Sequence, residues 1–315
     1  MTAGIELTEE TIFTWGAPPL KFGAGAVDEI GFEMAQFGAR RVLILTDPQI
    51  SALGIPARIA ESLTRHGITS EIFDGVHVEP TDDSMDKAAG YAREQGPWDG
   101  FIAVGGGSSI DTAKAVNLMT TDGGSNPVSD LWCEKALTLL AQSFRTAFRH
   151  GDDLEARGNT MLAATFAGMG FGNSGVHIPH ANAYPIAGMV KDYRPPYYPQ
   201  DEPMVPHGMS VSLTAPEAFR FSFPSAPERH LAAAALLAPD ADKPNDPGEQ
   251  LPAAVIRLMR DIEIPNGIGA VGYTEADIPD LVPGTMKQQR LLATCPRPVD
   301  EEDIAGIFAR SMENW

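Results

Sequence analysis

Cysteine is scarce in this sequence, since Cys133 and Cys295 are the only two among 315 residues. Two cysteines exclude a disulfide framework and a four-cysteine zinc site, and they favour a reducing compartment. Positive charge is scarce as well, because 23 Lys and Arg stand against 42 Asp and Glu, which leaves a formal net charge of −19. A field of that sign repels nucleic-acid backbones and anionic membranes, so we expect neither as a partner.

A long hydrophobic run is also lacking. The longest uncharged stretch, 158–190, contains two histidines and two prolines, which argue against a membrane span. The acidic residues 1–10 predict neither a secretory signal nor an arginine-rich transit peptide. We therefore expect a cytoplasmic protein. A chain of 315 residues with 43% hydrophobic content is long enough for two folded domains.

The first third of the chain alternates between two hydrophobic periods. Short apolar runs predict strands at 42–45, 71–73 and 101–104. Patterns of helical period predict helices at 55–66, 84–94 and 108–119. Strands that alternate with helices are typical of a parallel sheet, so residues 1–124 are predicted to form an α/β domain around such a sheet.

Residues 125–315 are predicted to form an all-α domain. Helical patterns run through 129–148, 154–170, parts of 215–237, 249–261 and 300–312. Cys133, on the first of these helices, is expected to pack in the core. The segment 191–206 holds five prolines and is expected to be an irregular connection. Aspartates three residues after Thr274 and Asp300 predict capping boxes at two helix starts.

A glycine-rich corner follows the third predicted strand. It consists of Gly105, Gly106, Gly107 and Ser108, with Asp111 in the next helical turn. Glycines let backbone N–H groups approach a diphosphate, and the following helix directs its positive end toward that anion. A tight turn from strand to helix explains the same residues equally well, so both interpretations stay open.

Asp47 ends the first predicted strand, directly before Pro48. A carboxylate at this place can accept hydrogen bonds from a ribose diol and repels a 2′-phosphate, which favours NAD over NADP. The alternative, which is at least as common, is that Asp47 only begins a turn with Pro48.

The helical half carries His177 and His180 in one segment and His207 in another. Neutral imidazoles from two segments can bind divalent iron or zinc, although a complete site needs a third or fourth ligand. From spacing alone, structural histidines are the more common outcome. The remaining histidines stand among charged or turn residues and are expected at the surface: His66, His77, His150 and His230.

Taken together, these motifs resemble the iron-containing (group III) alcohol dehydrogenase family. The resemblance is carried, in family order, by 22–25, 46–47, 105–108 with Asp111 and Lys114, 167–173, 180–185 and 205–208. Within the family the chain is most similar to the hydroxyacid-oxoacid transhydrogenase branch, through 227–230, 270–273, 277–279, 296–298, 301–303 and 311–312. The similarity covers nearly the whole chain in two blocks, 12–124 and 125–315.

The resemblance implies an oxidoreductase whose active site lies between a nucleotide-binding domain and a helical metal domain. Residues 1–124 would be an incomplete Rossmann-like α/β domain that binds NAD, and residues 125–315 a helical metal and substrate domain that is incomplete at its start. The residues expected to contact NAD are Asp47, Gly105, Gly106, Gly107, Ser108 and Asp111. His180 and His207 match the last two of four ligands for a divalent metal, Fe²⁺ or Zn²⁺. Tyr184, the catalytic candidate, stands where some members place a further active-site histidine. The implied reaction oxidises 4-hydroxybutyrate and reduces 2-oxoglutarate through bound NAD, so small hydroxy and oxo acids are the expected partners, and a homo-oligomer is compatible with them.

The chain departs from the family between Gly124 and Ser125, where members carry roughly a hundred further residues. That segment holds a cofactor-contacting loop and the helix that supplies the aspartate and the first histidine ligand. Two missing ligands are expected to weaken metal binding, because each lost ligand removes bonding and fixed geometry. The alternative to an active oxidoreductase is therefore an inactive remnant that binds only a nucleotide or a partner subunit.

Overall fold

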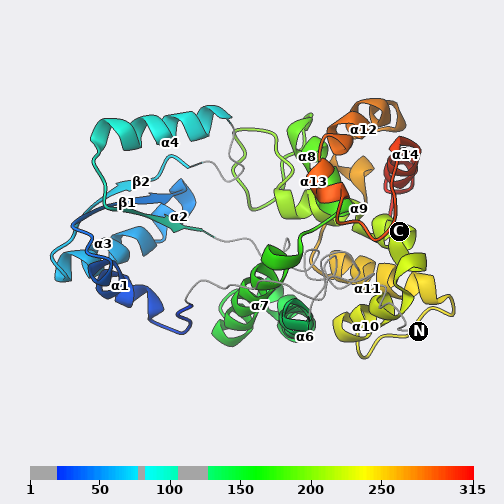
Figure 1. The fold of residues 1–315 in the computed structure, drawn as a ribbon, viewed down its shortest axis with the longest axis horizontal. Coiled ribbons are helices and arrows are strands. Elements are labelled where there is room, and N and C mark those ends of the chain that lie inside the picture. Colours follow the sequence, from blue (N-terminus) through cyan, green and yellow to red (C-terminus); the bar gives the residue numbers. More distant parts are fainter. Residues whose placement is uncertain (1–19, 77–81, 106–126) are drawn as a thin grey trace, which may run out of the picture. The chain divides into compact units, whose positions relative to one another are not determined.

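The computed structural model describes residues 20–76, 82–105 and 127–315 (Figure 1). Contacts divide the chain into two units. One unit spans 19–106, and the other contains the described residues 127–315. The domain boundary predicted near residue 124 falls outside the described residues, so it stays a prediction.

A three-stranded parallel sheet forms the centre of the unit 19–106. Its strands are β1 (Arg41–Thr46), β2 (Thr69–Phe73) and β3 (Gly100–Val104), in the order β2-β1-β3. In this register Val42 of β1 lies opposite Ser70 on one side and Gly100 on the other. The apolar run in β1 is fully buried from Val42 to Ile44, as expected for the central strand of a parallel sheet. The predicted α/β class is confirmed.

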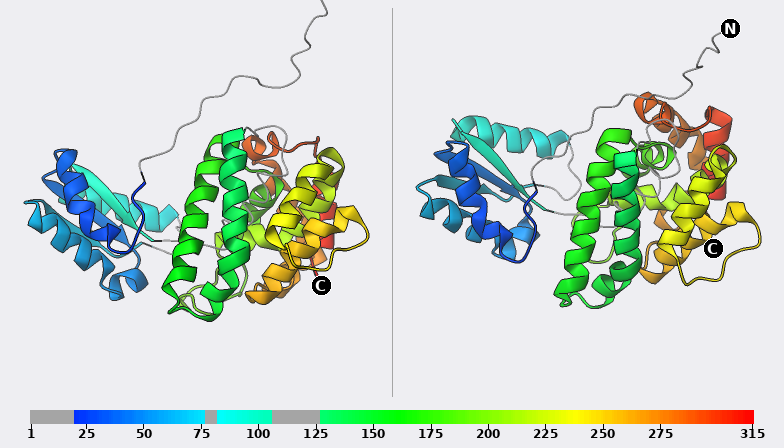
Figure 2. Two further views of the ribbon diagram at one scale, coloured as in Figure 1. Left: turned by 90° about the horizontal axis from the view of Figure 1, so that it is seen from below. Right: turned by 60° about the horizontal axis from the view of Figure 1, so that its bottom comes forward.

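Helices flank this sheet (Figure 2). They are α1 (Ile30–Gln36), preceded by the 3₁₀ turn Ala26–Glu29, α2 (Pro48–Ala52), α3 (Ile55–Arg65) and α4 (Asp82–Gln95). α3 buries Ile59 and Leu63, the pair whose spacing predicted it, and Gly67 beyond its end has the positive φ of a helix stop. α1 meets α3 so closely that a Cβ on Gly31 would lie 2.2 Å from the carbonyl oxygen of Ser62. The helix predicted at 108–119 falls outside the described residues.

The second unit is helical, as predicted. Its helices are α6 (Pro127–Arg149), α7 (Leu154–Ser174), α8 (Ile178–Gly188), α9 (His207–Ser222), α10 (Pro227–Leu237), α11 (Pro247–Asp261), α12 (Ile278–Met286), α13 (Gln289–Leu292) and α14 (Glu301–Arg310). Short 3₁₀ turns lie at Phe223–Ser225, Ile268–Val271 and Glu275–Asp277. The sequence patterns predicted α6, α7, α11 and α14 but missed α8, α12 and α13.

The core of this unit is a continuous set of buried aliphatic and aromatic side chains. α6 and α7 lie side by side, and α6 contributes Leu137 and Leu140, while α9 and α14 contribute Phe219 and Phe308. Cys133 is fully buried, and burial raises the pKa of its thiol, so its predicted packing role is confirmed. Across the described residues, no helix has the length and apolarity that crossing a membrane requires.

Local signals at the ends of elements were predicted correctly. Both capping boxes are present. The Asp277 carboxylate accepts a hydrogen bond from the Thr274 backbone N–H, and the Asp303 carboxylate accepts one from the Asp300 backbone N–H. The proline-rich connection 191–206 has no helix or strand. It joins α8 to α9 and so separates the two histidine-bearing segments in sequence.

Candidate active site

Three rings from α8 and α9 meet at one place in the helical unit. His180 and Tyr184 are four residues apart on α8, so they share one helix face. His207 is the first residue of α9, directly after Pro206. The ring centroids of His180 and His207 are 5.7 Å apart, and those of Tyr184 and His207 are 6.2 Å apart. The structure therefore brings together the two predicted metal ligands and the predicted catalytic candidate.

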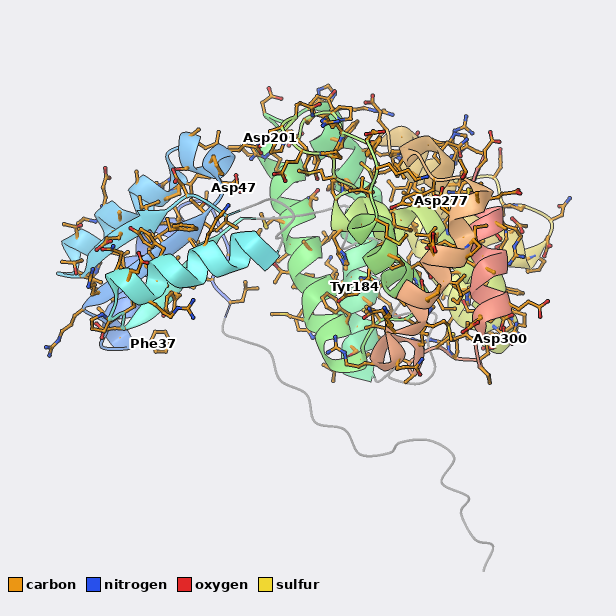
Figure 3. The ribbon with its side chains drawn as sticks, turned by 90° about the horizontal axis from the view of Figure 1, so that it is seen from above. Phe37, Asp47, Tyr184, Asp201, Asp277 and Asp300 are labelled. Carbon is orange, nitrogen blue, oxygen red and sulfur yellow. The ribbon has the colours of Figure 1, made fainter. Side chains whose placement is uncertain are left out.

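The three rings differ in exposure. His180 is 4% exposed, His207 is half-buried and Tyr184 is 49% exposed. Tyr184 is labelled on the helical unit in Figure 3. A small molecule can therefore reach Tyr184 and His207 from solvent, while His180 is buried.

A buried polar network fixes α8 against its neighbours. The Asn182 amide donates to the Thr214 hydroxyl of α9 over 3.2 Å, and the Thr285 hydroxyl of α12 donates to Asn182 Oδ1 over 3.1 Å. All three side chains are fully buried. Because Asn182 lies between His180 and Tyr184 on the other side of the helix, these bonds set the rotation of α8. Sequence reasoning missed Asn182, and the signal was a polar residue inside an otherwise apolar segment.

Two further contacts hold the other end of α8. The Tyr273 hydroxyl donates to the carbonyl oxygen of Ile186 over 2.6 Å, and burial raises the pKa of Tyr273, which keeps the donated proton in place. α12 approaches closely at Gly284, where a Cβ would lie 2.7 Å from the Pro185 ring. A larger residue at 284 would push α8 away and displace Tyr184.

The described residues supply only part of a metal site. Rings whose centroids are 5.7 Å apart can direct one nitrogen each toward a shared ion. However, the described residues contain no group of three or more His, Cys, Asp or Glu side chains that could hold a metal. A catalytic metal ordinarily has three protein ligands. The described residues therefore do not fit a complete catalytic metal centre.

His177, the third histidine of the sequence hypothesis, belongs to a different environment. It is fully buried at the N-cap of α8, and neither ring nitrogen has a hydrogen-bond partner among the described residues. Burial, and to a smaller degree the nearby His230, lowers the pKa of His177 to about 3. The ring is therefore neutral at physiological pH and acts as a buried structural group.

The surface prediction for His230 is wrong. His230 is 1% exposed on α10, and its Nδ1 donates to the carbonyl oxygen of Ala226 over 2.9 Å, while Nε2 lies 3.1 Å from the Ser222 hydroxyl. The charged neighbours Glu228 and Arg229 suggested the surface, but the helical period turns His230 inward. His66 and His150 are exposed as predicted, and His77 lies outside the described residues.

The predicted nucleotide-binding residues are only partly described. Asp47 is the N-cap of α2, and its Oδ1 accepts hydrogen bonds from the backbone N–H groups of Gln49 and Ile50, each over 2.9 Å. Asp47 thus begins a turn, as one of the two interpretations predicted. Contact between Asp47 and a ribose stays a prediction. Gly105 is exposed, with nothing within 4 Å of an added Cβ. The other corner residues lie outside the described residues: Gly106, Gly107, Ser108 and Asp111.

Two family models together match residues 18–312 of this chain. The model described as iron-containing alcohol dehydrogenase matches residues 18–146. The model described as the C-terminal part of the Fe-containing alcohol dehydrogenase family matches residues 120–312. The two matches overlap over 120–146, a range that includes the expected gap between Gly124 and Ser125.

Curated relatives are similar over almost the whole chain. The mitochondrial hydroxyacid-oxoacid transhydrogenases of Bos taurus and Homo sapiens are each 32% identical, over 97% of this chain and 91% of their own length. The probable mitochondrial hydroxyacid-oxoacid transhydrogenase of Dictyostelium discoideum is 29% identical, over 95% of this chain and 79% of its own length. The first alignment spans 426 positions against a chain of 315 residues, as expected where relatives carry an additional internal segment.

Solved structures have the same fold. A 1,3-propanediol oxidoreductase superimposes with a TM-score of 0.80 at 21% identity and covers 95% of this chain and 100% of its own. The NADH-dependent butanol dehydrogenase A of Thermotoga maritima superimposes with a TM-score of 0.73 at 16% identity and covers 91% and 95%. At these identities the likeness establishes the fold of the chain.

Proposed function

This chain belongs to the iron-containing alcohol dehydrogenase family, and on that premise we propose that it transfers hydride between a hydroxy acid and an oxo acid. The proposed substrates are 4-hydroxybutyrate and 2-oxoglutarate, and the proposed carrier is NAD. The names of the similar transhydrogenases support the two acid classes. The observation that carries the proposal is the meeting of His180, His207 and Tyr184 at the junction of α8 and α9.

The chemistry assigns tasks to these side chains. Oxidation of a hydroxy acid removes a hydride from the carbinol carbon and a proton from the hydroxyl group, and bound NAD supplies the hydride carrier. The accessible Tyr184 hydroxyl can hydrogen-bond the substrate hydroxyl and relay its proton to water, and the His207 imidazole can take up the proton when no metal is bound to it. His180, which is buried and packs edge-on against His207, would fix the orientation of that ring.

NAD is proposed to bind at Asp47, Gly105, Gly106, Gly107, Ser108 and Asp111. Asp47 Oδ2 accepts no hydrogen bond among the described residues, so one carboxylate oxygen remains for a ribose hydroxyl while Oδ1 caps α2. The same charge disfavours a 2′-phosphate and supports NAD over NADP.

A divalent metal is proposed to bind only weakly. His180 and His207 offer two imidazole nitrogens to Fe²⁺ or Zn²⁺. The described residues supply no third His, Cys, Asp or Glu ligand beside them. Since metal affinity rises with the number of fixed ligands, purified protein should lose its metal on dialysis.

Coupled turnover tests this proposal. Dialysed protein is mixed with NAD, 4-hydroxybutyrate, 2-oxoglutarate and an excess of Fe²⁺ or Zn²⁺, and 2-hydroxyglutarate is measured. Formation of 2-hydroxyglutarate by the wild type, and its loss in Tyr184→Phe and His207→Ala, would support the proposal. Absence of product with either metal would reject it.

A second candidate function is favoured by the incomplete metal site. In this case the chain binds a nucleotide, or a partner subunit, without redox chemistry. Calorimetric titration with NAD and elemental analysis for iron and zinc distinguish the two. Saturable NAD binding in protein that cannot turn over substrate supports the second candidate, and one metal per purified chain counts against it.

The compartment and the assembly state complete the proposal. We propose a cytoplasmic location on the support of two free cysteines, although the similar transhydrogenases are named mitochondrial. We propose assembly into a homo-oligomer as well. Fractionation of cells and the molar mass of the purified protein in solution test these two statements.

A further inference from the structure

A cavity of about 760 Å³ lies in the helical unit, away from the residues proposed for catalysis. The C-terminal end of α6 and the first half of α7 form two of its walls, and Tyr197 and Glu263 lie on its other sides. Cavities of a few hundred Å³ or more hold small organic ligands. This one has no assigned ligand.

Apolar side chains form much of the lining. Phe144 is 5% exposed, whereas Phe148 is 39% exposed and Met161 is 55% exposed. Phenylalanine and methionine with this exposure can bury considerable apolar area against a ligand. The lining therefore suits a ligand with an apolar body.

Two guanidinium groups line the same cavity. Arg149 ends α6, and Arg157 lies on the first turn of α7, where its Nη1 donates to the Gly151 carbonyl oxygen over 3.1 Å. Neither arginine forms an ion pair within the described part of the chain. In a protein of net charge −19, these two arginines, with no ion-paired carboxylate among the described residues, outnumber the one carboxylate of the lining, Glu263, and give the cavity local positive charge. Guanidinium groups bind carboxylates by paired hydrogen bonds.

The backbone supplies an independent observation. Among the described residues, the two non-glycine residues with positive φ are Tyr197 (69°) and Glu263 (61°), and both line this cavity. Tyr198 N–H donates to Pro195 O over 3.4 Å, which closes a turn around Tyr197. Glycine adopts such a turn position at lower cost, so a tyrosine here carries a conformational penalty.

Glu263 is in a comparable position at the end of α11. Its N–H donates to Arg260 O over 3.3 Å, and Ile264 N–H donates to Met259 O over 2.9 Å, which is the hydrogen-bond pattern of a Schellman motif. Glycine is the usual residue at that place. Strained non-glycine residues concentrate at ligand-binding sites, where the side chain compensates for the backbone cost.

We propose that this cavity binds a small amphipathic monocarboxylate. The carboxylate lies against Arg149 and Arg157, and the apolar chain lies on Phe144, Phe148 and Met161. Glu263 also lines the cavity and selects against a second carboxylate on the ligand, because like charges in one cavity repel. The proposal rests on the helical unit alone and does not depend on the proposed redox function.

Calorimetric titration with octanoate tests the site. Octanoate should bind saturably at one molecule per chain, and both octanol and the dicarboxylate suberate should bind about tenfold more weakly or worse. Arg149→Gln and Arg157→Gln should each weaken octanoate binding about tenfold, since each removes a charge-assisted hydrogen bond. Arg290→Gln, at an exposed arginine outside the cavity, is the matched control and should leave the affinity unchanged. Non-saturable binding, equal affinity for octanol, or equal weakening by the control overturns the proposal.

Glycine variants separate binding from folding. Glu263→Gly and Tyr197→Gly relieve the positive φ, so the thermal midpoint should stay the same or rise. Glu263→Gly should bring suberate to within about twofold of octanoate, and Tyr197→Gly should weaken octanoate several-fold, by the loss of an apolar contact surface. If neither variant alters binding, the two side chains do not serve a ligand and the proposal fails.

Discussion

The two ends of α9 are held in different ways. At its start, His207 meets the rings of His180 and Tyr184 from α8, and the group reaches solvent through Tyr184. Near its other end, Glu217 is 5% exposed and is bound by both Arg220 and Arg310.

The charged end ties α9 to two other helices. Arg220 binds the carboxylate of Glu249 on α11 through Nε and Nη2, with distances of 2.7–3.0 Å. Arg310 of α14 donates to Glu217 Oε2 over 2.8 Å. The charged end thus fixes the helix, whereas the histidine end is the one proposed to face a ligand. Substitutions at the first should mainly change stability, and substitutions at the second should mainly change activity.

The largest expected stability effect comes from Glu217→Ala. Removal of this carboxylate leaves Arg220 and Arg310 without a shared partner, and the free energy of unfolding should fall by about 3 kcal/mol, less than for a fully enclosed pair because both arginines are partly exposed. Urea unfolding followed by circular dichroism measures the change. Glu228→Ala, at an exposed carboxylate of α10, should cost less than about 0.5 kcal/mol. Equal effects of the two substitutions would contradict the assignment of Glu217 as the anchor.

Acid should destabilise the protein through His177. Burial lowers the pKa of His177 to about 3, below the unfolded value of about 6.5, so the native state keeps the ring neutral while the unfolded state takes up a proton. The contribution of neutral His177 to the free energy of unfolding is fully present above pH 6.5 and is lost as the pH falls toward 3. Between pH 7 and pH 5 the loss from this residue is about 2 kcal/mol.

His177→Phe removes this titrating group. Unfolding free energies at pH 7, 6 and 5 should therefore decline less steeply in the variant than in the wild type. His150→Gln, at an exposed histidine, is the control and should keep the wild-type slope. The prediction is wrong if His177→Phe and wild type show the same dependence on pH.

The network that orients α8 should have a smaller effect on stability. Thr285→Val removes the hydroxyl that donates to Asn182 and leaves one amide oxygen buried without a partner, which costs about 1–2 kcal/mol. Thr285→Ser keeps the hydroxyl and should cost less. If the network also positions Tyr184, Thr285→Val should lower kcat at pH values where the fold is intact, and Thr285→Ser should restore most of it.

His207→Ala should have the smallest effect on stability. The ring is half-buried at the first residue of α9, so the free energy of unfolding should change by less than about 1 kcal/mol. Thermal unfolding measures this. A loss as large as that of Glu217→Ala would mean that both ends of the helix serve the same structural purpose.

The sequence predicts those parts of the fold whose hydrophobic period is visible. The run in β1 and the spacing of Ile59 and Leu63 in α3 both mark buried surfaces directly. α8 was missed because it is buried on nearly every side, so that no polar face alternates with an apolar one, and because Pro179 and Pro185 lie within it.

The candidate site, like the fold, could be predicted from the sequence only in part. The irregular connection 191–206 gives no spacing rule that would bring His207 to His180, so only the family resemblance paired them. His230 could have been assigned to the interior from sequence, because His230, Ala234 and Leu237 recur at helical spacing and are buried together. Its charged neighbours concealed that pattern.

The most direct test of the account compares coupled turnover in the wild type and in His207→Ala. With NAD, 4-hydroxybutyrate, 2-oxoglutarate and excess Fe²⁺, the account predicts that the wild type forms 2-hydroxyglutarate and that the variant, folded to the same extent, is at least about a hundredfold slower. Equal rates in the two proteins, or no product from either, would contradict the claim that the rings at the start of α9 carry the reaction.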